Sequence, residues 1–293
     1  MNVSVIYINY NTYDLLINSI QSVIELTTDI SYEIIIVDND SSTNEKIKLQ
    51  QYCTNNNIRL IESSSNLGFG KANNLAASQA KGEYLFFLNP DTYLINNAIK
   101  KLFLFAKNNN ILTCGGNLYS KDLKPIHSYW MTMPSAYAEL SSLFCDIPLK
   151  IKYKKSHEHN LTNKPQKVDY ITGADLMIQH ELFENIGGFD SDYFMYFEET
   201  DLQYRIKNLG HKIYNLPTAQ IVHLESQSLN SRTKKLNLFF TSRKIFYQKN
   251  RTTSQLKIAN AILKFSCVIR IITFTLLFNK KKLVYWKTIL KQC

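Results

Sequence analysis

Apolar runs alternate with segments of helical periodicity through the N-terminal part of the chain. Four short runs rich in Val, Ile, Leu and Phe are expected to form strands, at residues 3–8, 33–37, 58–61 and 83–88. Segments with helical spacing separate them, at 13–25, 42–55 and 71–80. Continuous apolar strands that alternate with helices are typical of a parallel sheet covered on both faces. The pattern therefore predicts an α/β fold with a Rossmann-like, mostly parallel sheet flanked by helices.

Polar and small residues follow each of the four expected strands. They are Asn9, Tyr10 and Asn11, residues 38–42, residues 66–70, and the triplet Asn89-Pro90-Asp91. Ligands of such sheets bind beyond the carboxyl ends of the strands, so we expect one cleft to collect these residues. The sequence has no G-x-G-x-x-G fingerprint and no P-loop. We therefore expect the cleft to take a nucleotide, but not in the manner of a dinucleotide-binding domain or an ATPase.

The second half of the chain has a less regular pattern. Residues 118–167 mix aromatic residues, prolines and charges, and we interpret them as a loop-rich insertion. A more ordered pattern returns at 168–175, and a glycine turn at 187–190, a helix within 192–208 and a short strand at 219–223 follow. The last strand is expected to end at His223, much as the fourth strand leads to Asp91.

Composition and cysteine usage narrow the class of protein. The chain has 293 residues, of which 45% are apolar, enough for one large domain or a domain with an appendage. The five cysteines form no C-x-x-C pair, which argues against a zinc ribbon, a redox motif or a disulfide framework. A reducing cytosol is the expected compartment, and we find no signal-peptide pattern at the N-terminus.

Positive charge is concentrated at the C-terminus. Residues 226–293 carry fifteen Lys or Arg and no Asp or Glu, so the rest of the chain is mildly acidic. Within this basic tail, the apolar segment 262–278 is shorter than the roughly 20 residues that cross a bilayer, and Lys280, Lys281 and Lys282 follow it. We expect an interfacial helix on anionic lipid. A helix packed on the rest of the protein is the alternative, and no recognition motif supports nucleic-acid binding.

Taken together, these motifs resemble glycosyltransferase family 2, with its GT-A fold, and within it the rhamnosyltransferase-type enzymes of bacterial surface polysaccharide synthesis. The resemblance covers about residues 3–228 and rests on the order and spacing of several short pieces. They are Tyr10-Asn11, residues 37–42, 66–70 and 88–92, Thr172-Gly173-Ala174, and residues 187–190, 196–202 and 223. The chain departs from the family at Glu198-Glu199, where Glu-Asp is usual, and at Asp40, where Ala or Gly is common.

The resemblance implies a donor site for a dTDP- or UDP-sugar and a divalent cation, Mn²⁺ or Mg²⁺. Asp91 would be one metal ligand and His223 the second, since both ions accept oxygen ligands and Mn²⁺ also accepts imidazole. The expected donor-binding residues are Tyr10, Asn11, Asp38, Asn66, Gly68, Lys71, Asn89, Asp91, Gly173 and Asp175. Several have a plainer interpretation: Asp91 as a turn residue, Asp38 as a helix cap, Lys71 as a solvated side chain, and His223 and Asp175 as structural residues.

The acidic helix start at 198–201 is expected to supply the general base. By the resemblance, Glu199 takes the proton of the acceptor hydroxyl, with Asp201 and then Glu198 as fallbacks. An ordinary acidic first helical turn is the alternative. One base and one displacement imply inversion at the anomeric carbon.

The function that the resemblance implies is an inverting glycosyltransferase of O-antigen- or capsule-type synthesis. It would move a sugar, with rhamnose favoured, to a glycan or lipid-linked acceptor on the cytoplasmic face of the membrane. Residues 1–228 would form the catalytic domain, with a nucleotide-sugar half (1–118) and an acceptor half (119–228), and 229–293 the membrane-associating region. A catalytically inactive nucleotide-sugar-binding protein is one alternative. A sugar nucleotidyltransferase is another, although residues 9–12 lack the basic glycine-rich loop it needs.

Overall fold

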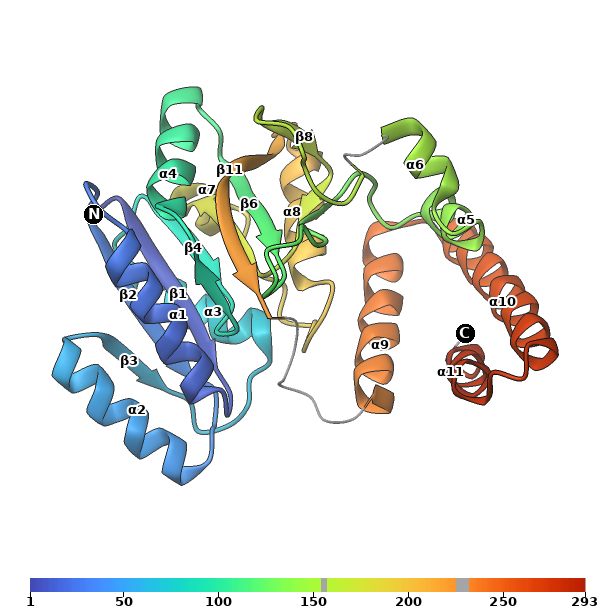
Figure 1. Cartoon of the computed structure of the whole chain (residues 1–293), viewed down its shortest axis with the longest axis horizontal. Coiled ribbons are helices and arrows are strands. Elements are labelled where there is room, and N and C mark those ends of the chain that lie inside the picture. Colours follow the sequence, from blue (N-terminus) through green and yellow to red (C-terminus); the bar gives the residue numbers. More distant parts are fainter. Residues whose placement is uncertain (154–156, 225–231, 293) are drawn as a thin grey trace.

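The computed structural model describes residues 1–153, 157–224 and 232–292, and a mixed sheet of nine strands forms its centre (Figure 1). The strand order is β3-β2-β1-β4-β10-β6-β11-β5, with β8 paired to β11. These strands are β1 Val3–Asn9, β2 Tyr32–Asp38, β3 Arg59–Glu62, β4 Tyr84–Leu88, β5 Thr92–Leu94, β6 Thr113–Tyr119, β8 Gln166–Val168, β10 Asp175–Gln179 and β11 Ile213–His223. A separate two-stranded ribbon pairs β7 (Tyr129–Trp130) with β9 (Tyr170–Ile171).

The N-terminal half of the sheet is parallel, as the apolar runs predict. Strand β1 pairs in parallel with both β2 and β4, and β2 pairs in parallel with β3. Strand β10 enters antiparallel between β4 and β6, and β5 and β8 pair antiparallel with β11. The predicted α/β fold with a flanked, mostly parallel sheet is confirmed, and the antiparallel strands of the second half were not predicted.

Helices cover both faces of the sheet because alternate strand residues point to opposite sides. Val5 and Tyr7 of β1 share a core with helices α1 (Tyr13–Leu26), α2 (Thr43–Asn56) and α4 (Ala98–Asn109). Ile6 and Ile8 face the other core, which contains α3 (Phe69–Ala77), α7 (His180–Asn185) and α8 (Glu198–Asn208). The three helices expected before β4 are therefore present, with α3 placed slightly earlier than residues 71–80.

The segment 118–167 is more ordered than a loop-rich insertion. It contains helices α5 (Ala136–Leu143) and α6 (Ile147–Tyr153) as well as β7. Ser135 caps α5 by accepting a hydrogen bond from the backbone N–H of Ala138. Helices this short carry little periodicity, so the prediction of loops here was wrong in part.

The basic tail folds into three helices beside the sheet, α9 (Arg232–Asn250), α10 (Thr253–Leu276) and α11 (Lys280–Leu290) (Figure 1). The apolar segment expected at 262–278 is the second half of α10, which begins at a capping box between Thr252 and Gln255. At 24 residues, and with a mean hydropathy of 1.6 in its most apolar window of 18 residues, α10 is long and apolar enough to cross a membrane by length and composition alone. The prediction that this segment is too short to span was therefore wrong.

Candidate active site

One cavity of about 520 Å³ opens at the carboxyl ends of β1 and β4. Its walls come from segments that lie far apart in the sequence. They include Tyr10 and Thr12, Asn39, Asn66, Gly68 and Phe69, Asn89 to Asp91, Thr172 to Ala174, Phe194 to Tyr196, Glu198 and Glu199, His223, and Lys234, Lys235 and Leu238 of α9. The cleft expected from the strand ends is therefore present, and the tail helix α9 forms part of it.

A network of amide side chains shapes the wall that follows β2 and β3. Asn39 Nδ2 donates to Asn66 Oδ1 (3.1 Å) and to the carbonyl of Gly68 (3.3 Å), and Asn39 Oδ1 accepts from the N–H of Leu67. Gly68 has a φ of +80°, and a Cβ there would lie 2.2 Å from the carbonyl oxygen of Phe194. Only glycine fits this close backbone approach. Asn66 and Gly68 thus line the cavity as expected, together with Asn39, which the sequence did not single out.

Asp38 and Asn11 lie behind this wall. Asp38 is fully buried, and its oxygens accept from Asn9 Nδ2 (3.0 Å) and from the N–H of Ser41 (3.1 Å). Asn11 has a left-handed backbone and accepts from the N–H of Ser42 (2.9 Å). Neither residue belongs to the cavity lining of the described chain. Asp38 thus closes the turn at 38–41, whereas the N-cap residue of α2 is Ser42. The alternative of Asp38 as a helix cap does not hold, and its base-reading role stays a prediction.

Asp91 and His223 meet at one end of the cavity. Strand β5 pairs antiparallel with β11 so that Thr92 faces His223, and Asp91 Oδ1 lies 3.3 Å from His223 Nε2. The two side chains are only 13% and 18% exposed. No group of three or more His, Cys, Asp or Glu side chains suited to a metal occurs in the described residues. A carboxylate and an imidazole fit Mn²⁺ when phosphate or water oxygens complete the coordination.

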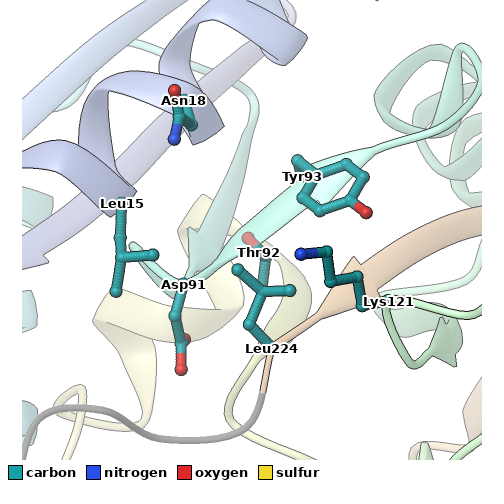
Figure 2. A pocket seen from close by; sticks show the side chains of 7 residues that line it. All are labelled: Leu15, Asn18, Asp91, Thr92, Tyr93, Lys121 and Leu224. Atoms are coloured by element: carbon teal, nitrogen blue, oxygen red, sulfur yellow. The ribbon is translucent and has the colours of Figure 1, made fainter.

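A second cavity, of about 310 Å³, adjoins the first and shares Asp91 and Leu15 with it. Figure 2 shows Asn18 and Leu15 of α1 on one side of this cavity and Lys121 with Tyr93 on the other. Thr92 and Leu224 complete its lining. Asp91 is therefore reached from two sides of the strand end.

Two glutamates at the start of α8 also line the cavity. Tyr196 and Phe197, which precede them, both have left-handed backbones, with φ of 71° and 68°. Such strain in non-glycine residues is typical of functional sites. Glu198 is 4% exposed, and its Oε2 finds no hydrogen-bond partner within the described part of the chain. The Cγ of Glu199 lies 3.6 Å from where a Cβ on Gly173 would be.

Burial changes the acidity of this pair. It raises the pKa of Glu198 well above its ordinary value, and the neighbouring Glu199 charge adds to the shift. Burial also raises the pKa of Glu199, and backbone and Thr200 hydrogen bonds oppose the shift. A carboxylate whose pKa moves toward neutrality is a better proton acceptor for a hydroxyl.

Asp201, the first alternative candidate for the general base, has a structural role instead. Its carboxylate accepts from Arg205 Nε (2.8 Å), Asn250 Nδ2 (2.8 Å) and Tyr193 OH (3.4 Å). It is 2% exposed and, among the residues that the structure describes, does not line the cavity. The geometry therefore does not support Asp201 as a base, because its oxygens are engaged away from the cavity.

Two expected donor contacts also lie elsewhere. Asp175 is fully buried in β10, where Oδ2 accepts from the N–H of Gly116 (2.6 Å). Lys71 is exposed on α3. Neither is part of the cavity lining in the described ranges. The structural interpretation of Asp175 and the solvated interpretation of Lys71 fit these positions, whereas Tyr10, Asn89 and Gly173 do line the cavity as expected.

The fold and the site together define the class of protein. Transfer of a sugar from a sugar diphosphate requires three parts, and all three are present here. They are a GT-A-like sheet, an Asp–His pair suited to a cation, and a buried carboxylate on the same cavity. Residues 4–187 match the model of Glycosyl transferase family 2, and the chain belongs to this family.

Curated relatives agree with this assignment. The low-salt glycan biosynthesis hexosyltransferase Agl10 of Haloferax volcanii is 27% identical over 76% of this chain and 67% of its own. The rhamnosyltransferase WbbL of Escherichia coli K12 is 25% identical over 67% of this chain and 74% of its own. The N-acetylglucosaminyl-diphospho-decaprenol L-rhamnosyltransferase of Mycobacterium tuberculosis is 25% identical over 70% of both chains. The prediction of a rhamnosyltransferase-like glycosyltransferase of polysaccharide synthesis is therefore confirmed at the level of the family and of these relatives.

Solved structures show the same fold. GalNAc-T7 with UDP, GalNAc and Mn²⁺ superposes with a TM-score of 0.62 at 17% identity, over 84% of this chain and 50% of its own. The mannosyltransferase PcManGT of Pyrobaculum calidifontis, in complex with GDP-Man and Mn²⁺, gives a TM-score of 0.59 at 14% identity. It covers 99% of this chain and 84% of its own.

Proposed function

We propose that the protein is an inverting, divalent-metal-dependent glycosyltransferase that moves a sugar, with rhamnose favoured, from a dTDP- or UDP-sugar to a lipid-linked glycan. The observation that carries this proposal is the placement of the Asp91–His223 pair and the Glu198–Glu199 pair on one cavity. The names of the relatives WbbL and RfbF of Shigella flexneri, a dTDP-rhamnosyl transferase, favour rhamnose. The mycobacterial relative's name favours a sugar on a lipid diphosphate as acceptor.

The residues on the cavity have separate tasks in this reaction. Asp91 and His223 would hold the cation, which offsets the charge that develops on the leaving diphosphate. Glu199 takes the proton of the acceptor hydroxyl while that oxygen bonds to the anomeric carbon and the bond from this carbon to the phosphate oxygen breaks. Asn39, Asn66 and Gly68 fix the wall on the nucleotide side. A single displacement leaves the anomeric centre inverted.

A thermal-shift panel of nucleotide sugars, with Mn²⁺ and with EDTA, tests the proposal on the full chain. One dTDP- or UDP-sugar should raise the melting temperature only with the metal, because a ligand that binds the native state alone stabilises it. That donor should then be consumed when a sugar–diphosphate–lipid acceptor is added. Binding without transfer would favour the inactive nucleotide-sugar-binding protein. Turnover of a sugar phosphate with a nucleoside triphosphate would favour the nucleotidyltransferase.

We also propose that the enzyme works on the cytoplasmic face of the membrane through α10. Exposed apolar side chains lie on one stripe of this helix: Ile258, Phe265, Val268, Ile269, Ile272 and Leu276. Only 17% of its most apolar window is buried in the protein. Lys257 and Lys264 flank the stripe, and Lys280–Lys282 follow the helix, which suits anionic headgroups.

Flotation with vesicles that contain anionic lipid checks this placement. Replacing Phe265, Ile272 and Leu276 by Ser should reduce the floated fraction by about tenfold or more, because each buried apolar side chain contributes about 1.5 kcal/mol or more. Ile24, Ile47 and Leu104, exposed on the sheet domain, provide a matched triple Ser control that should float like the wild type. Equal flotation of both triple variants would contradict the assignment of α10 as the membrane contact.

A further inference from the structure

Two lysines of the tail reach the catalytic cavity. Lys234 and Lys235, in the first turn of α9, line it together with Leu238. In the part of the chain that the structure describes, they are the only Lys or Arg side chains in this lining. The cavity therefore has acidic groups at Asp91, Glu198 and Glu199 and two lysines contributed by the tail.

Aromatic packing fixes α9 against the segment that carries the glutamates. The Phe239 ring lies 5.2 Å from that of Phe197 and 6.1 Å from that of Tyr196. Ser242 Oγ donates to the carbonyl of Met195 at 2.8 Å. The lysines, one turn before Phe239, are consequently held at a set place relative to Glu198 and Glu199.

An unsatisfied group in the same cavity points to a ligand. Glu198 is more than nine-tenths buried, and its Oε2 has no hydrogen-bond partner among residues 1–153, 157–224 and 232–292. A buried polar atom without a partner is costly unless a ligand satisfies it. A sugar hydroxyl is a suitable partner beside the glutamate that we assign as the base.

Three kinds of chemical group follow one another in chain order, from the catalytic helix α8 into the tail. The glutamates lie at the cavity, Lys234 and Lys235 come next on α9, and α10 with its exposed apolar stripe begins at Thr253, just after α9 ends at Asn250. An acceptor built as sugar, diphosphate and lipid has the same order of groups. The donor diphosphate, in contrast, would have its charge offset by the cation that Asp91 and His223 are proposed to hold.

We propose that Lys234 and Lys235 form a binding site for the diphosphate of a lipid-linked sugar acceptor. The inference rests on the proposed function and deepens it. The pair would place the acceptor sugar at Glu199. Donor binding would be left to the wall formed by Asn39, Asn66 and Gly68. Ammonium groups bind phosphate as point charges, so loss of both should weaken the contact strongly.

Steady-state transfer by the full-length enzyme tests the site with two acceptors that share one sugar. One is the sugar on a polyprenyl diphosphate, and the other is its alkyl glycoside, which lacks phosphate. Lys234→Gln with Lys235→Gln should raise KM for the diphosphate acceptor by tenfold or more, because two charge-assisted contacts are lost. KM for the alkyl glycoside and the affinity for the donor should stay within twofold. Lys212→Gln with Lys244→Gln, at exposed lysines outside the cavity, is the matched control.

Each other outcome overturns the inference. An equal rise of both acceptor KM values would mean that the lysines only support the local structure. A loss of donor affinity with unchanged acceptor KM values would assign the lysines to the donor diphosphate. If the wild-type enzyme transferred sugar to neither acceptor from any donor, the proposed function itself would fail, which is a distinct result.

Discussion

Glu199→Gln is expected to lower kcat by about 100- to 10,000-fold, the usual contribution of a general base. Glutamine keeps the size of the side chain on the cavity wall but cannot accept the hydroxyl proton. Donor binding should be unchanged, because the donor contacts are assigned to other residues of the cavity, Asn39, Asn66 and Asp91. Transfer kinetics and a thermal shift with the donor and Mn²⁺ measure the two effects separately.

The pH profile of the wild-type enzyme gives an independent readout of the same residue. Burial raises the pKa of Glu199, and the base works only when it is deprotonated. The value of kcat/KM should therefore fall as pH is lowered through this raised pKa, beginning above the pH at which an exposed glutamate is protonated.

Two variants serve as comparisons for Glu199→Gln. Glu181→Gln, at an exposed position of α7, should behave like the wild type. Asp201→Asn should instead lower the free energy of unfolding by about 2 kcal/mol, because it weakens a buried carboxylate contact with Arg205. Full activity of Glu199→Gln, together with loss of activity in a folded Asp201→Asn protein, would transfer the role of base to Asp201.

Asp91→Asn and His223→Ala are expected to lower kcat/KM by about 100-fold or more each, through loss of the cation. Both variants should also lose the part of the donor's thermal shift that depends on Mn²⁺. The two effects should not add in the double variant, because removal of either ligand disables the same site. Isothermal titration with Mn²⁺ in the presence of the nucleoside diphosphate gives the metal affinity directly.

Asp122→Asn, at an exposed turn, controls for the loss of a negative charge and should bind metal normally. Metal-dependent donor binding that survives in both Asp91→Asn and His223→Ala would place the cation elsewhere. Asp91 directly precedes β5 and His223 ends β11, so neither substitution falls within a helix.

The first half of the fold could be predicted because local signals and tertiary structure agree there. The runs that became β1, β2 and β4 are continuous apolar strands, and each connection has helical periodicity. Strand β10 lies antiparallel between β4 and β6. This placement depends on pairing with strands that are distant in sequence, and such pairing leaves no local pattern in the sequence. Likewise, the apolar segment of α10 was predicted too short because Lys257 breaks the apolar pattern before residue 262, although the helix itself begins at the capping box of Thr252.

Predictions for the site succeeded where a strand or helix end delivers the residue. Asp91, His223 and Glu199 lie on the cavity because β4, β11 and α8 end or begin there. Asp38 and Asp201 belong to similar motifs, but hydrogen bonds to Asn9 and Ser41, and to Arg205 and Asn250, turn their oxygens inward. Lys234 and Lys235 were missed because their charge is indistinguishable from that of the rest of the basic tail.

The domain boundary expected at residue 228 remains a prediction, and the cavity extends beyond it. Glu199 on one side and Lys235 on the other line the same space. Asn250, near the end of α9, holds Asp201 of the catalytic helix through its side chain. Removal of the tail is therefore expected to disturb the catalytic helix as well as any contact with lipid.

The pairing of β5 with β11 also orders events during synthesis of the chain. Strand β5 is the last in the sheet order and, within the described residues, pairs with β11 alone. Domains emerge from the ribosome N-terminus first. Asn39 and Asn66 are therefore synthesised long before His223. The pair of Asp91 and His223 can form only after β11 has been made and has paired with β5, so the residues proposed to hold the metal come together among the last parts of the sheet.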